Sequence, residues 1–146
     1  MKQNFIFVIT LLTIFSIVNA FPRQFYKRDT IFNPCTGSPD TITVTITPDP
    51  LVAGPNVFNV TGTLTNGTID TGSELLIQLQ DDAGEVIGEP FPFDICANVT
   101  CPATTFSLQK EIQVDTLPAE EYNIQVLIND ANDNTLACAT TTVPSA

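Results

Sequence analysis

Apolar and polar residues alternate strictly along several short segments of the chain. In the segment Thr41–Thr47, Ile42, Val44 and Ile46 are separated by threonines, and the same period of two returns from Tyr122 to Ile128. Alternate side chains lie on opposite faces of a β-strand, so the apolar residues are expected to face a core and the threonines to face water.

Residues that favour turns, such as Pro48-Asp49-Pro50, Asn66-Gly67 and Asp81–Gly84, separate segments of this kind. The predicted strands are residues 41–47, 56–64, 75–79, 85–87, 106–114, 122–129 and 136–143. No helical period follows the first thirty residues. Short strands at this spacing predict an all-β fold, an immunoglobulin-like antiparallel sandwich of two sheets and about seven strands.

The N-terminal segment has a different pattern. Lys2 is followed by fourteen uncharged, largely apolar residues from Phe5 to Val18, and Val18-Asn19-Ala20 offers small side chains for a peptidase. This pattern predicts a secretory signal peptide over residues 1–20. The alternative, an uncleaved membrane anchor, is disfavoured because the apolar run is short for a membrane span.

The pair Lys27-Arg28 resembles a dibasic processing site, so residues 21–28 are either a short pro-segment or a flexible basic arm. The folded domain is expected over residues 29–146. It would keep only Lys110 among the five basic residues but all sixteen acidic ones, hence a net charge of −15. Such a surface is self-repelling, which favours a monomer and disfavours binding to nucleic acid or to anionic membranes through a basic patch.

Four cysteines in a secreted chain predict two disulfides in one of three pairings. Cys96 and Cys101 are close enough for a local bridge, which would leave Cys35 and Cys138 to join the two ends of the domain. A zinc site is the alternative, but the chain has no histidine and no Cys-x2-Cys pair.

Three sequons are candidates for N-glycosylation in the secretory pathway, at Asn59, Asn66 and Asn98. Asn66 is the best candidate because it lies in a predicted turn. Asn59 lies in a predicted strand, in the phase opposite to Phe58, so it is expected to face outward.

The stretch from Pro90 to Pro102 combines Phe91 and Phe93 with three prolines and ends at the Cys96…Cys101 pair. Proline cannot donate to a β-ladder, so regular pairing is disfavoured here except at the edge of a sheet. We interpret the stretch as a rigid aromatic lip at the mouth of an apolar pocket between the sheets.

The order of several motifs resembles the ML lipid-recognition domain over Cys35–Val143. The most specific motif is Phe93-Asp94-Ile95-Cys96 followed by Cys101-Pro102, with Leu136-Ala137-Cys138 near the end. Weaker matches are Pro48-Asp49-Pro50 with Gly54, Gly62-Thr63-Leu64, Thr71-Gly72, and Leu117-Pro118 before Tyr122. The family includes the Niemann–Pick type C sterol carrier and the fungal phosphatidylglycerol/phosphatidylinositol transfer proteins. The resemblance implies two sheets splayed around one lipid.

Nine residues are the candidates for contact with such a lipid, and the alternative for each is ordinary core packing. They are Phe91, Phe93, Phe106, Leu108, Lys110, Tyr122, Ile124, Val126 and Ile128.

Lys110 is unusual in this set, because alternation along the strand 106–114 places it on the apolar face. The cost of burying an unpaired ammonium favours a bulge that would turn Lys110 outward. If alternation holds, its stem follows the pocket wall and its ammonium reaches the mouth, where a lipid phosphate or hydroxyl would lie.

Enzymatic chemistry is not expected, because a chain without histidine cannot form a Ser-His-Asp or Cys-His arrangement. The acid pairs Asp81-Asp82 and Glu120-Glu121 lie in predicted turns. Residues 129–134 offer oxygen ligands for calcium, but a polar hairpin turn explains them better. No cofactor or metal is expected.

The predicted function is therefore a lipid carrier that binds a sterol or a phospholipid, with transient contact with membranes. Its predicted location is secreted, or the lumen of the vacuole or lysosome. The alternative is a secreted structural or adhesive sandwich module whose core is filled by its own side chains.

Overall fold

The computed structural model describes residues 29–38 and 40–144. Within them lie eight strands: β1 (Asn33–Pro34), β2 (Ile42–Thr47), β3 (Gly54–Thr63), β4 (Glu74–Gln80), β5 (Val86–Asp94), β6 (Thr105–Val114), β7 (Tyr122–Asn129) and β8 (Thr135–Val143). The expected signal peptide and pro-segment, residues 1–28, lie outside this range. No helix with the length and apolar character needed to cross a membrane occurs among the described residues.

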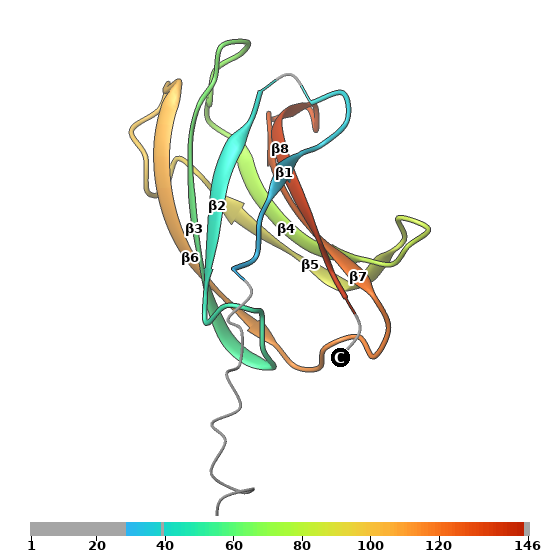
Figure 1. Ribbon diagram of the computed structural model, residues 1–146. Coiled ribbons are helices and arrows are strands. Elements are labelled where there is room, and N and C mark those ends of the chain that lie inside the picture. The colour runs from blue at the N-terminus through green and yellow to red at the C-terminus, as the bar shows by residue number, and fades with distance from the viewer. Residues whose placement is uncertain (1–28, 39, 145–146) are drawn as a thin grey trace, which may run out of the picture.

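The strands form two antiparallel sheets that face each other (Figure 1). One has five strands in the order β1-β8-β7-β4-β5, and the other has three in the order β2-β3-β6. The predicted sandwich is confirmed. The additional strand is β1, a two-residue segment that pairs with β8 and is too short to produce a periodic pattern.

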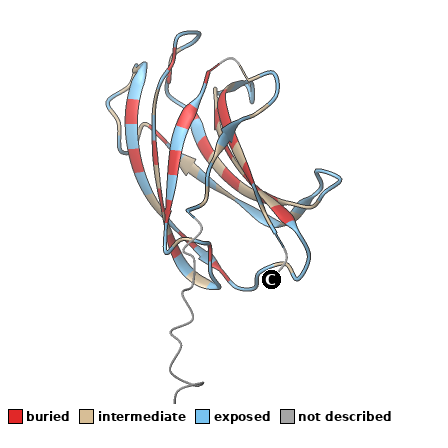
Figure 2. Ribbon diagram, in the orientation of Figure 1, coloured by how far each residue is buried: buried red, intermediate tan, exposed pale blue. Residues whose placement is uncertain are grey.

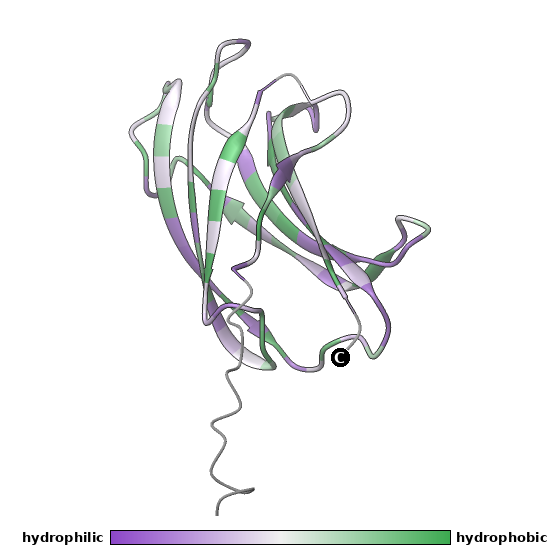
Figure 3. Ribbon diagram, viewed as in Figure 1, coloured by the Kyte–Doolittle hydropathy of each residue, from purple (hydrophilic) through white to green (hydrophobic). Residues whose placement is uncertain are grey.

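Alternation along the strands separates the core from the surface, as the buried stripes of Figure 2 show. In β2, for example, Ile42, Val44 and Ile46 are buried while the threonines between them are exposed. Figure 3 shows the same alternation as apolar bands separated by nearly neutral ones along β2. The interior is formed by apolar side chains from both sheets.

The predicted aromatic lip is part of a strand, although a register shift interrupts its pairing with β4 between Ile87 and Phe91. β5 extends from Val86 to Asp94 and includes both Pro90 and Pro92, whereas the sequence predicted a strand over residues 85–87 only. Pro90 lies in the segment between Ile87 and Phe91 that has no partner in β4. Pro92 is tolerated because β5 is the last strand of its sheet, so one side of its backbone needs no partner.

Both predicted disulfides are present. Cys35 is bonded to Cys138 across 103 positions of sequence, and Cys96 is bonded to Cys101 across five. The first bridge joins the start of the domain to its last strand, β8. The second closes the turn that follows β5. Since all four cysteines are bonded in this way, the alternative of a zinc site is wrong.

Candidate functional site

On one side of the sandwich a backbone bridge joins the two sheets, whereas on the other side their last strands do not pair. The bridge joins Asp40, just before β2, to Ala137 in β8. On the opposite side lie β5 and β6, each the last strand of its sheet. The two sheets therefore meet along this side through side chains, which we call the β5–β6 opening.

The β5 wall of this opening is aromatic. Phe91 and Phe93 pair with Ile77 and Leu75 of β4, so they share the inward face of the five-stranded sheet with these buried residues. Unlike their partners, Phe91 and Phe93 are only half-buried, although they pack against the core. A further inward residue, Ile87, continues the wall and was not predicted as part of the site. An edge strand leaves one flank of each side chain uncovered, which explains this partial exposure.

Lys110 lies on the facing wall. Its strand β6 pairs with β3 in continuous register from Gly54↔Val114 to Thr63↔Thr105, so the bulge that the burial cost favours is absent. Lys110 stands opposite Phe58 and keeps the inward phase. It is half-buried, and its Nζ lies 5.4 Å from the centroid of the Phe93 ring on the other sheet. This distance is within the range of a cation–π contact.

The other six predicted contact residues lie deeper, between the sheets. All are at most 4% exposed: Phe106 and Leu108 in β6, and Tyr122, Ile124, Val126 and Ile128 in β7. Burial raises the pKa of the Tyr122 hydroxyl. The structure thus divides the predicted set into a half-buried group at the opening (Phe91, Phe93 and Lys110) and a buried group behind it.

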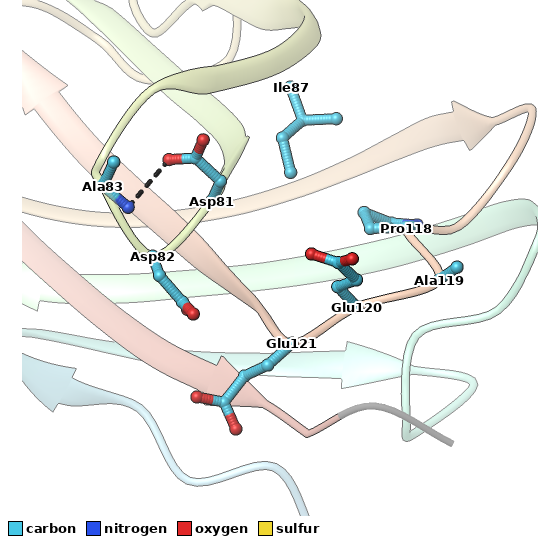
Figure 4. Close-up of a pocket in the computed structure, with 8 residues that line it drawn as sticks. All are labelled: Asp81, Asp82, Ala83, Ile87, Pro118, Ala119, Glu120 and Glu121. Atoms are coloured by element: carbon cyan, nitrogen blue, oxygen red, sulfur yellow. Dashed lines mark hydrogen bonds between the residues drawn. The ribbon is translucent and has the colours of Figure 1, made fainter.

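A surface hollow of about 400 Å³ lies near one end of the opening (Figure 4). The β4–β5 turn contributes Asp81, Asp82 and Ala83, and the β6–β7 connection contributes Pro118, Ala119, Glu120 and Glu121. Ile87 of β5 supplies apolar surface. Sequence reasoning assigned both acid pairs to turns, which is correct, but it did not place the two turns beside each other.

Other polar clusters serve the fold. In the β7–β8 turn, the Asp130 carboxylate accepts hydrogen bonds from the side-chain amide of Asn134 and from the backbone N–H groups of Asn134 and Asn132. These bonds, the side-chain ones first, lower the pKa of Asp130. This is the predicted polar hairpin turn. Among the described residues, no three His, Cys, Asp or Glu side chains are grouped so as to hold a metal ion.

The three sequons differ in accessibility. Asn66 and Asn98 are exposed, in the β3–β4 connection and in the Cys96–Cys101 turn. Asn59 is half-buried in β3, between Thr45 of β2 and Gln109 of β6.

The described architecture defines the protein as an immunoglobulin-like sandwich with one side-chain-lined opening between its sheets. Residues 29–145 match the family model described as ML domain, so the chain belongs to the ML domain family. This membership confirms the resemblance seen in the sequence.

Two solved structures share the fold. The chain resembles a Niemann-Pick type C2 protein from Japanese carpenter ant, with 16% identity and a TM-score of 0.55, covering 80% of this chain and 99% of that one. It also resembles chicken MD-1 complexed with lipid IVa, with 13% identity and a TM-score of 0.50, covering 79% and 88% of the two chains. No curated protein sequence gives a significant match.

Proposed function

We propose that the protein is a secreted or lumenal carrier that binds one sterol or phospholipid between its two sheets and transfers it between membranes. Membership of the ML domain family supports lipid binding as the general function. The match to chicken MD-1, a structure with bound lipid IVa, is consistent with this class of ligand.

The observation that carries the proposal is the aromatic wall of the β5–β6 opening. Phe91 and Phe93 face inward but stay half-buried, so apolar surface is left at the junction of the two sheets. Behind it, the buried β7 positions Ile124, Val126 and Ile128 carry aliphatic side chains. An acyl chain or sterol that enters here would meet mostly apolar side chains.

Binding requires no chemical step. Each methylene that moves from water into an apolar interior is stabilised by about 0.8 kcal/mol, so burial alone lets a carrier compete with a membrane. Because the buried β7 side chains are at most 3% exposed, the two sheets have to separate at the opening to admit a ligand. Such separation is feasible there, since β5 and β6 are terminal strands of different sheets.

The nearly complete burial of the β7 side chains also favours a second candidate function, a structural or adhesive module with a filled core. The two candidates differ in whether lipid accompanies the protein. Native mass spectrometry of the protein purified from its own host is expected to show an added lipid mass that solvent extraction removes. Protein that carries no lipid, and takes up neither sterol nor phospholipid from vesicles, would support the filled-core module instead.

Secretion is part of the proposal and rests on the predicted signal peptide. N-terminal sequencing of the mature protein tests it and also decides between the two interpretations of residues 21–28. A start at Phe21 indicates a retained basic arm, and a start at Asp29 indicates cleavage after Lys27-Arg28. A protein that retains residues 1–20 as an anchor would contradict the proposal of a soluble carrier.

A further inference from the structure

We propose that Lys110 selects lipids that carry a negatively charged head group at the β5–β6 opening. This inference rests on the proposed lipid-binding function and deepens it by naming the class of ligand. The shared chemistry is one anionic oxygen group, either the phosphodiester of a phospholipid or the carboxylate of a fatty acid.

The first argument is the position of Lys110. On the inward face of β6, its neighbours Leu108 and Ile112 are 3% and 2% exposed, yet Lys110 between them is only half-buried. A lysine at such a position buries its aliphatic stem along apolar surface and extends its ammonium towards water. The ammonium therefore lies where the apolar interior meets the solvent, the level at which a lipid head group meets its acyl chain.

The second argument is the contact that Lys110 makes. Its Nζ lies over the ring of Phe93 on the other sheet, at 5.4 Å from the ring centroid. The face of a phenyl ring attracts a cation but supplies no oxygen acceptor for the three N–H donors of an ammonium. An anionic head group placed at the opening would supply such acceptors. The Phe93 ring would hold the ammonium beside that head group.

The third argument is charge. Lys110 is the only basic side chain among the described residues, which also contain sixteen acidic ones. Acidic groups near the opening, such as Asp81, Asp82, Glu120 and Glu121 at the hollow, would repel an anionic head group. Without Lys110 the described domain is therefore expected to prefer uncharged lipids. The location of Lys110, the single cation of the described residues, at the opening reverses that preference locally.

The test compares lipids that share one acyl chain. Binding of fluorescent phosphatidylglycerol, the free fatty acid and the matching fatty alcohol is measured with the parent protein and with Lys110→Met, which keeps the stem and removes the charge. Loss of one charge-assisted hydrogen bond at this partly exposed site is expected to weaken binding of an anionic lipid roughly tenfold. Binding of the alcohol is expected to change less than twofold, which also shows that the variant is folded.

Two further variants separate the local contact from general electrostatics. Lys110→Arg keeps a cation at the opening and is expected to preserve the preference for anionic lipids. Gln109→Glu lowers the net charge by the same one unit as Lys110→Met, but on the exposed outer face of the same strand. It is expected to change anionic binding less than twofold. In the parent, added salt should reduce the preference for phosphatidylglycerol over the alcohol.

The outcomes are distinct. A loss confined to phosphatidylglycerol identifies the phosphodiester as the partner, and a loss confined to the fatty acid identifies the carboxylate. Equal affinity of parent and Lys110→Met for both anionic lipids overturns the role of Lys110 while leaving lipid binding intact. Failure of the parent to bind any of the three lipids, or a sterol tested beside them, overturns the proposed function itself.

Discussion

The ring of Phe106 lies across Gly62 on the neighbouring strand. A Cβ atom added at Gly62 would lie 2.9 Å from Cζ of Phe106 and 3.0 Å from Cγ2 of Ile42. Gly62 and Phe106 pair directly between β3 and β6, so the missing side chain of one residue makes room for the ring of the other. The end of the Phe106 ring therefore lies over the neighbouring strand β3 of its own sheet.

The first prediction follows from this contact. Gly62→Ala is expected to lower the free energy of unfolding by about 1–3 kcal/mol, because the added methyl forces the Phe106 ring out of position. Urea unfolding measures the change. In the background Phe106→Leu, where the ring is absent, the same substitution is expected to cost clearly less. Additive effects of the two substitutions would mean that the ring does not depend on Gly62.

The second prediction concerns the two disulfides. In the chain-entropy model, the Cys35–Cys138 bridge stabilises the fold by about 4–5 kcal/mol, and the short Cys96–Cys101 loop by about 2 kcal/mol. Replacing both cysteines of a pair by alanine is therefore expected to lower the unfolding midpoint more for the first pair. Peptide mapping under non-reducing conditions checks the pairing, and a Cys35–Cys96 peptide would contradict it.

The third prediction is a pH dependence that originates at Asp40. Its Oδ2 accepts hydrogen bonds from the backbone N–H groups of Thr65 and Asn66 at 2.8 and 3.0 Å, and its Oδ1 accepts one from the Thr65 hydroxyl at 2.5 Å. These bonds, that from the Thr65 hydroxyl above all, lower the pKa of Asp40 in the folded state. A carboxyl whose pKa is lower in the folded state stabilises the fold above its unfolded value and loses this contribution as the pH falls through the folded value.

Asp40→Asn is accordingly expected to destabilise the protein most at pH values above about 5, where the parent carboxylate is ionised in both states. The difference between the two proteins should shrink as the pH falls below about 4. Urea midpoints measured at several pH values give this difference directly. A difference that stays constant down to the folded pKa would show that the Asp40 charge does not hold the β3–β4 connection.

The fourth prediction tests the aromatic wall of the opening. Replacing both Phe91 and Phe93 by alanine is expected to leave the protein folded, because both side chains are only half-buried. It is expected to abolish most uptake of lipid from vesicles, because the apolar wall of the opening is removed. Phe58→Ala is the contrasting variant. Phe58 is fully buried, so its truncation should cost about 3–5 kcal/mol of stability. Unfolding of the Phe91 and Phe93 double variant would show that these residues are core.

The fifth prediction is that Asn66 carries a glycan when the protein passes through the secretory pathway. Asn66 is exposed, and its side-chain amide donates only to the neighbouring Thr65 hydroxyl at 3.1 Å among the described residues. Asn66→Gln is expected to remove one unit of glycan mass, whereas Asn59→Gln, in the middle of β3, is expected to change the mass less. Unchanged mass of the Asn66 variant would contradict this assignment.

Most of the fold could be predicted because the signals are local. A period of two reports which face of a strand is buried, wherever that strand lies in the molecule, so the strands around Ile42–Ile46 and Tyr122–Ile128 were recognised from their own residues. The turn residues between them, and the short spacing of Cys96 and Cys101, are local as well. The same period predicted the inward phase of Lys110, although the cost of burying its charge argued against it.

The tertiary structure decided what depends on distant neighbours. Whether Pro90 and Pro92 can belong to a strand depends on the position of that strand at the edge of a sheet, which no residue of β5 reveals. The hollow between Asp81–Ala83 and Pro118–Glu121 likewise requires two turns to lie side by side. Above all, Phe93 in β5 and Lys110 in β6 belong to different sheets. Only the packing of these sheets brings the Lys110 ammonium over the Phe93 ring.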